Sequence, residues 1–129
     1  MYRGGCLCGV VRFRVEGRLC DPIACHCTQC RRQSGHFFAA VAAPREAVSF
    51  DGDSGLAWYR HTDTALRGFC RECGATLFWK GDGAPDIMVA MGALDDTGDL
   101  RLAAHYWVAD KGGYYEIADG LPQHARGDG

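Results

Sequence analysis

Two stretches decide the fold of this chain: Gly4-Gly5-Cys6-Leu7-Cys8-Gly9 near the start and Phe69-Cys70-Arg71-Glu72-Cys73-Gly74 past the middle. In extended chain, residues i and i+2 point to one side, so Cys6 and Cys8 can grip one ion, whereas a disulfide between them would be strained. Cys70 and Cys73 have the two-residue gap of a zinc knuckle, and the following glycine permits a tight curl.

Joining the two pairs gives a closed four-thiolate site that ties the first strand to the centre of the chain. We therefore expect a structural zinc on Cys6, Cys8, Cys70 and Cys73, which can contribute on the order of 10 kcal/mol of folding free energy. Two alternatives are half-sites that bridge subunits and free cysteines that are buried as small apolar residues.

A third stretch, Cys25-His26-Cys27-Thr28-Gln29-Cys30, supplies three thiols from six residues. Three protein ligands and an open position are typical of a catalytic zinc, which polarises a carbonyl or holds an incoming thiol as the thiolate. The alternative is that Cys20, His26 or His36 closes the site. His26 points away from its flanking cysteines in an extended turn, so we expect it beside the site or at the surface.

Length and composition point to one globular domain, residues 1–129. The chain has eight cysteines, 47% hydrophobic residues and 23% charged residues, which is close to the globular average apart from the cysteines. The longest uncharged apolar run, Phe37 to Ala43, is too short for a signal peptide or a membrane span. We therefore expect a cytoplasmic protein, in which disulfides do not persist and the thiols serve metal binding or catalysis.

The arginines of the first quarter do not indicate a nucleic-acid partner. Residues 1–32 carry six arginines against two acids, but the net charge of the chain is −2. Arg12 and Arg14 alternate with Val11, Phe13 and Val15, which is the pattern of the solvent-facing side of a strand. We expect no nucleic acid and no membrane as partners.

The pattern of short apolar runs predicts a mainly β domain with at most one or two short helices. Strands are expected over residues 11–15, 37–43, 47–50, 56–60, 76–80, 87–91 and 105–108, each bounded by Gly, Pro or Asp. The best helical signal is Thr28 to Ser34, where Thr28 can cap the first turn and Gly35 can end the helix.

The cysteine motifs together resemble those of the glutathione-dependent formaldehyde-activating enzymes, a family with centromere protein V as a eukaryotic relative. The resemblance runs almost end to end. Beyond the three cysteine stretches, it includes Gly92-Ala93-Leu94-Asp95-Asp96 and His105-Tyr106-Trp107-Val108. The segment Lys111-Gly112-Gly113-Tyr114 departs from the family, in which relatives tend to place a proline and a tryptophan.

The resemblance implies a zinc-stapled antiparallel β-tent with two zinc ions. A structural zinc lies on Cys6, Cys8, Cys70 and Cys73, and a second, more labile, catalytic zinc lies on Cys25, Cys27 and Cys30. The implied activity is that of a carbon–sulfur lyase that joins glutathione, or another small thiol, to formaldehyde or a related aldehyde. The alternatives are a non-catalytic interaction module with both zincs structural, and a redox sensor that uses Cys25 and Cys30.

Overall fold

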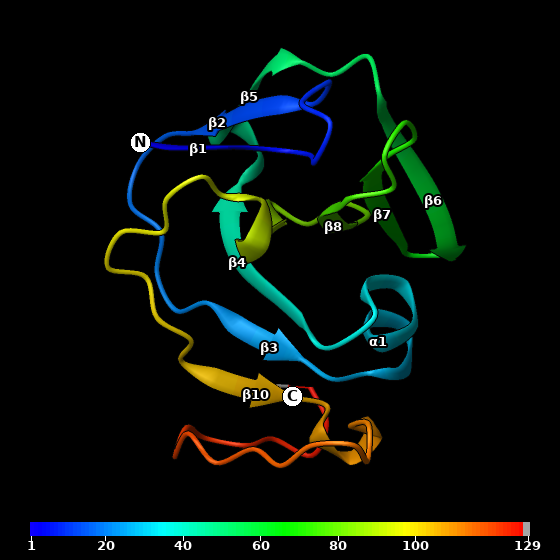
Figure 1. Ribbon diagram of the computed structural model, residues 1–129, viewed down its shortest axis with the longest axis vertical. Coiled ribbons are helices and arrows are strands. Elements are labelled where there is room, and N and C mark those ends of the chain that lie inside the picture. Colours follow the sequence, from blue (N-terminus) through cyan, green and yellow to red (C-terminus); the bar gives the residue numbers. More distant parts are fainter. Residues whose placement is uncertain (128–129) are drawn as a thin grey trace.

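The computed structural model describes residues 1–127, so the last two residues of the expected 1–129 domain lie outside the described part. Its strands form two sheets (Figure 1). The smaller sheet is antiparallel and has the order β1-β2-β5. Its strands are β1 (Tyr2–Gly5), β2 (Arg12–Val15) and β5 (Val48–Gly52).

The larger sheet has seven strands in the order β10-β3-β4-β9-β8-β7-β6. They are β3 (Ile23–Cys25), β4 (Phe38–Pro44), β6 (Leu56–Thr62), β7 (Ala65–Cys70), β8 (Thr76–Gly81), β9 (Asp86–Ala90) and β10 (Ala104–Tyr106). Neighbouring strands are antiparallel except β10 and β3, which run parallel. The expected mainly β, antiparallel architecture is confirmed with that one exception.

The predicted helix is confirmed as α1 (Thr28–Ser34), and Gly35 ends it in the left-handed conformation with φ 88°. The predicted N-cap was wrong. Cys27 caps the helix instead, because its backbone is extended and its Sγ accepts the Cys30 N–H at 3.3 Å. Three single-turn 3₁₀ helices complete the elements: η1 (Arg45–Ala47), η2 (Met91–Ala93) and η3 (Val108–Asp110).

All seven predicted strands are present, with ends shifted by up to two residues. The last one was predicted too long, since β10 ends at Tyr106. Trp107 takes a left-handed conformation, φ 58°, which breaks the strand and starts η3. Three strands were missed altogether, namely β1, β3 and β7.

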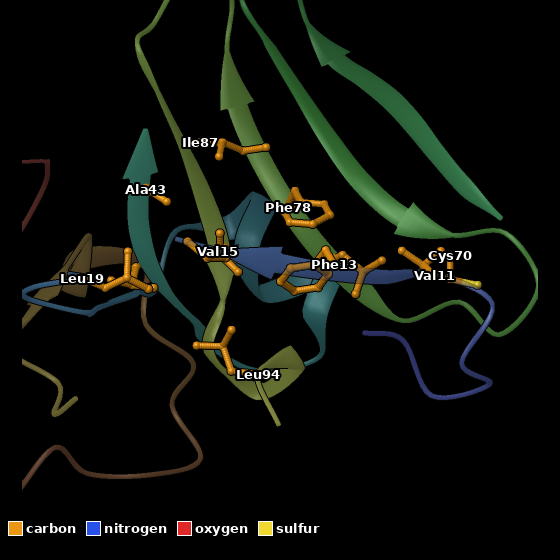
Figure 2. Close-up of a cluster of buried hydrophobic side chains, with 12 residues drawn as sticks. Val11, Phe13, Val15, Leu19, Ala43, Cys70, Phe78, Ile87 and Leu94 are labelled. Atoms are coloured by element: carbon orange, nitrogen blue, oxygen red, sulfur yellow. The ribbon is translucent and has the colours of Figure 1, made fainter. Parts of the chain in front are cut away.

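The core lies where the small sheet packs on the large one, as Figure 2 shows. The alternation that begins just before β2 and continues along it buries Val11, Phe13 and Val15. The Phe13 ring meets Phe78 of β8 edge-on, with centroids 5.0 Å apart. Cys70 at the end of β7 is fully buried in the same core. The first cysteine cluster is therefore anchored in the packing that joins the two sheets.

Candidate metal centres

The structure brings Cys6, Cys8, Cys70 and Cys73 together, with their four sulfurs all within 4.8 Å of one another. The Cys6 and Cys8 sulfurs are 3.6 Å apart, and those of Cys8 and Cys70 are 3.8 Å apart. Four sulfurs at about 2.3 Å from a tetrahedral zinc are separated by about 3.8 Å. The donor set and its spacing therefore fit a structural zinc.

Backbone N–H groups already point at these sulfurs. Val11 N–H donates to Cys6 Sγ at 3.3 Å, and Cys73 N–H donates to Cys70 Sγ at 3.5 Å. The pKa of the Cys73 thiol is lowered to about 6, mainly by a hydrogen bond from the backbone of Cys8 and then by one from Ala75. The pKa of Cys8 is raised to about 11 instead, because a hydrogen bond from the backbone of Val10 is outweighed by desolvation and by contacts with Cys6, Cys70 and Cys73. Four sulfurs this close do not all ionise by themselves, and a bound cation would stabilise them as the thiolates that bind metal.

The second cluster holds Cys25 at the end of β3, Cys27 at the cap of α1 and Cys30 within α1. Their sulfurs also lie within 4.8 Å of one another, and no fourth Cys, His, Asp or Glu among residues 1–127 joins them. Cys20 is exposed and lies apart from this group. It lines a hollow of about 840 Å³ that includes no residue of either cluster.

The thiols of the second cluster differ in the direction in which their pKa values are shifted. Hydrogen bonds from Cys25 and Cys30 lower the pKa of Cys27, whereas the pKa of Cys25 is raised by its contact with Cys27 and then with Cys30. Sulfurs this close cannot all ionise without a cation among them. A divalent ion removes that conflict, so this donor set also fits a soft metal such as zinc.

A chain of hydrogen bonds holds the loop between Cys25 and Cys27. His26 is 1% exposed, and its Nε2 lies 2.9 Å from Nδ1 of His105. His105 Nε2 lies 2.8 Å from the Asp119 carboxylate, and the Tyr115 hydroxyl bonds His26 Nδ1. An ionised Asp119 accepts from His105, so His26 donates from Nε2 and accepts from Tyr115 at Nδ1.

Neither nearby histidine is therefore placed as a fourth ligand. Both ring nitrogens of His26 are engaged, and it is buried, so the expectation of a surface position is excluded. Burial first, and then the repulsion that His105 exerts when it is protonated, lowers the pKa of His26 to about 4. His36 Nδ1 bonds the hydroxyl of Tyr114. Tyr114, Tyr115 and Asp119 were missed in the sequence because no periodic pattern surrounds them.

A buried arginine lies against the second cluster. Arg67 of β7 is 5% exposed, and its Nη1 and Nη2 lie 3.7 and 3.6 Å from Cys30 Sγ. Nη2 also donates to Gln29 Oε1 at 3.2 Å. Sequence reasoning missed Arg67, and the signal was an arginine between Leu66 and Gly68 in an otherwise apolar stretch.

Beside Arg67 a groove of about 390 Å³ runs between α1 and the β6–β7 pair. It is lined by Thr28, Gln29, Arg32, Gln33, Tyr59, His61 and Arg67. Figure 1 shows α1 facing the β6–β7 end of the large sheet. The groove therefore opens next to the helix that carries Cys30.

The sequence of residues 1–110 matches the family described as glutathione-dependent formaldehyde-activating enzyme. The chain belongs to this family. An uncharacterized lyase of Schizosaccharomyces pombe is 26% identical over 120 residues, which are 92% of this chain and 86% of that protein. A crystal structure of a Rhodobacter sphaeroides protein superposes with a TM-score of 0.63 at 27% identity, covering 75% of this chain and 91% of the other.

Two further properties of this family member concern its cysteines and its helices. All eight of its cysteines are free thiols rather than disulfides. Within residues 1–127, no helix has the length and apolar character needed to cross a bilayer. The chain of this glutathione-dependent formaldehyde-activating enzyme family thus carries two separate thiol clusters, of four and of three cysteines.

Proposed function

We propose that this family member is a zinc-dependent carbon–sulfur lyase-type enzyme of the cytoplasm. It joins glutathione or another small thiol to formaldehyde or a related aldehyde. Cys6, Cys8, Cys70 and Cys73 hold a structural zinc, and Cys25, Cys27 and Cys30 hold a second, exchangeable zinc. The family membership and the lyase name of the yeast relative support the reaction class.

The observation that carries the proposal is the difference between the two clusters. The first offers four sulfurs, and the second offers three with no further donor from residues 1–127. A closed set of four ligands is typical of structural zinc, whereas three ligands leave a position for a substrate. The engagement of His26 by His105 and Tyr115 supports the three-ligand arrangement.

The reaction balances without an oxidant or a reductant. The carbon–sulfur bond forms as the carbonyl double bond becomes single, and the thiol proton ends on the new hydroxyl oxygen. A zinc with an open position supplies Lewis-acid polarisation and stabilises a thiolate when it is bound.

The chain's own residues orient the substrate. The His26–His105–Asp119 chain fixes the loop that carries Cys25 and Cys27. The groove along α1 receives the remainder of the thiol substrate, where Arg32 and His61 are placed to pair with its carboxylates. A peptide thiol with ionised carboxylates fits these partners.

Zinc counting and turnover test the proposal. We expect two zinc ions per chain and the loss of only one of them to a mild chelator. Glutathione–formaldehyde adduct formation, followed by NMR exchange, is expected to exceed the spontaneous rate only in the two-zinc form. A two-zinc protein with no rate above the spontaneous reaction excludes this activity.

A further inference from the structure

We infer that Arg67 is a positioning residue of the second metal centre, where it offsets the charge of the cysteine ligands and tunes Cys30 through N–H···S hydrogen bonds. The inference rests on the part of the proposed function that places a metal on Cys25, Cys27 and Cys30. It deepens that proposal, because it adds a residue outside the ligand set on which the properties of the site depend.

Arg67 contacts two neighbouring residues of α1, Gln29 and Cys30. Both terminal nitrogens of its guanidinium lie within 3.7 Å of Cys30 Sγ, and Nη2 is held by Gln29 Oε1 at 3.2 Å. Gln29 and Cys30 both belong to α1, so the planar fork is aimed at one turn of the helix. Guanidinium N–H groups are fixed in direction, unlike the rotating ammonium of lysine.

Arg67 and the cysteine that it contacts are both buried. Arg67 is 5% exposed and Cys30 is also 5% exposed. A buried arginine is costly unless an anion or acceptors compensate it. None of the ion pairs formed within residues 1–127 involves Arg67. The sulfur of Cys30 and the amide of Gln29 are its side-chain partners. With a metal bound at the second site, Cys30 would be a thiolate and would supply the compensating negative charge.

The positive charge of Arg67 balances the charge that a metal-loaded second site would carry. Three thiolates around a divalent ion leave one net negative charge in a partly buried site. The guanidinium cancels that charge, and its N–H groups withdraw electron density from the Cys30 sulfur. Partners just outside a ligand set commonly change metal affinity by about 10–100-fold. The neutral site has a less electron-rich ligand at Cys30. It therefore binds an incoming thiolate more readily at its open position.

The test uses the full-length chain loaded with Zn²⁺ or Co²⁺, and needs no substrate. We expect Arg67→Met to weaken Zn²⁺ binding at the second site by about 10–100-fold, and to move the thiolate-to-Co²⁺ charge-transfer band to lower energy. Arg67→Lys keeps the positive charge but loses the two fixed N–H donors. We therefore expect it to restore Zn²⁺ affinity more fully than it restores the energy of the charge-transfer band. Arg60→Met, which changes an exposed arginine on β6 paired with Asp82, is the control and leaves both unchanged.

Metal at the first site reports folding in every variant. Arg67→Met with its first-site metal, wild-type second-site affinity and an unshifted band overturns the inference. If Arg67→Met loses the first-site metal as well, Arg67→Lys decides, and an unshifted band in that variant overturns the inference. A wild-type chain that binds one ion only contradicts the proposed function itself, which distinguishes that failure from this one.

Discussion

Arg67 and Cys70 lie three residues apart on β7, and they reach different cysteine clusters. Cys70 contributes its sulfur to the four-cysteine cluster, while Arg67 donates to Cys30 of the three-cysteine cluster. One strand therefore spans both candidate metal centres. Loss of the first metal is expected to displace Arg67, whereas loss of the second leaves the anchor of β7 in place.

That asymmetry predicts opposite outcomes for two cysteine variants. Cys73→Ala removes one of the four sulfurs. A structural zinc held by them would contribute on the order of 10 kcal/mol of folding free energy, so the domain is expected to unfold. Cys27→Ser is expected to lose the second metal and the activity while thermal melting stays near that of the wild type. Equal loss of stability in both variants would instead favour a module with two structural zincs.

The cap of α1 gives a finer test at the same position. Cys27 Sγ accepts the Cys30 N–H, and a serine hydroxyl can replace it, whereas alanine cannot. With the second metal removed from all proteins, Cys27→Ala is expected to be about 1 kcal/mol less stable than Cys27→Ser. Chemical denaturation of the metal-stripped proteins measures this difference, and identical midpoints would show that the cap contributes nothing.

His105→Ala is expected to destabilise the domain by at least about 2 kcal/mol. His105 is 3% exposed, so its removal leaves a cavity, and Nε2 of the buried His26 loses its partner. His61→Ala, at an exposed position, is the matched control and should stay within about 0.5 kcal/mol of the wild type. Denaturant unfolding compares the two, and equal effects would contradict a structural role for the hydrogen-bond chain.

The same chain predicts the titration of Asp119. The Leu121 backbone N–H first, and then His105, lower the pKa of this carboxyl below its ordinary value of 3.8. The unfolded chain therefore binds a proton at a higher pH than the native chain does. The contribution of Asp119 to stability is complete above about pH 4 and is lost as the pH falls through its native pKa. Carbon NMR should find Asp119 mostly ionised at pH 3.8, and half-protonation there would refute the contact.

Gly4 of β1 lies between Phe13, its partner on β2, and Ala93 of η2, and it has no room for a side chain. A Cβ on Gly4 would lie 2.5 Å from the Phe13 ring and 2.6 Å from the Ala93 carbonyl oxygen. Gly4→Ala is expected to cost about 1–3 kcal/mol. Gly92→Ala places its methyl in open space and serves as the control in the same melting experiment. A Gly4→Ala protein as stable as the control would show that Phe13 and η2 can shift to admit the methyl group.

The sequence predicted those parts of the fold that depend on local pattern. The alternation of β2 and the signals that begin and end α1 are local, and the structure has both. β7 was missed because its pattern is broken by the buried Arg67 and by Gly68. A Cβ at Gly68 would lie 2.9 Å from the Trp58 ring, so the indole of the paired strand covers the glycine. Such a cross-strand contact leaves no periodic trace in one sequence.

The candidate site divides in the same way. The spacing of the cysteines was enough to group them into clusters of four and three, which the structure brings together. The partners of those clusters come from distant segments, since Arg67 reaches Cys30 from β7 and Asp119 reaches His26 only through His105. Because such contacts depend on how the strands are ordered in the sheets, they could not be predicted before the topology was known.

The parallel pairing of β3 with β10 has a consequence for the order in which the molecule forms during synthesis. β3 leads directly into Cys25, yet its partner lies at Ala104–Tyr106, and residues 122–126 then bond back onto β10 and η3. All members of the four-cysteine cluster are present once residue 73 has left the ribosome. The three cysteines of the other cluster are made earlier, but β3, which leads into Cys25, gains its partner strand β10 only from residues 104–106. We therefore expect the loop that carries Cys25 and Cys27 to take up its final geometry after the four-cysteine cluster has come together.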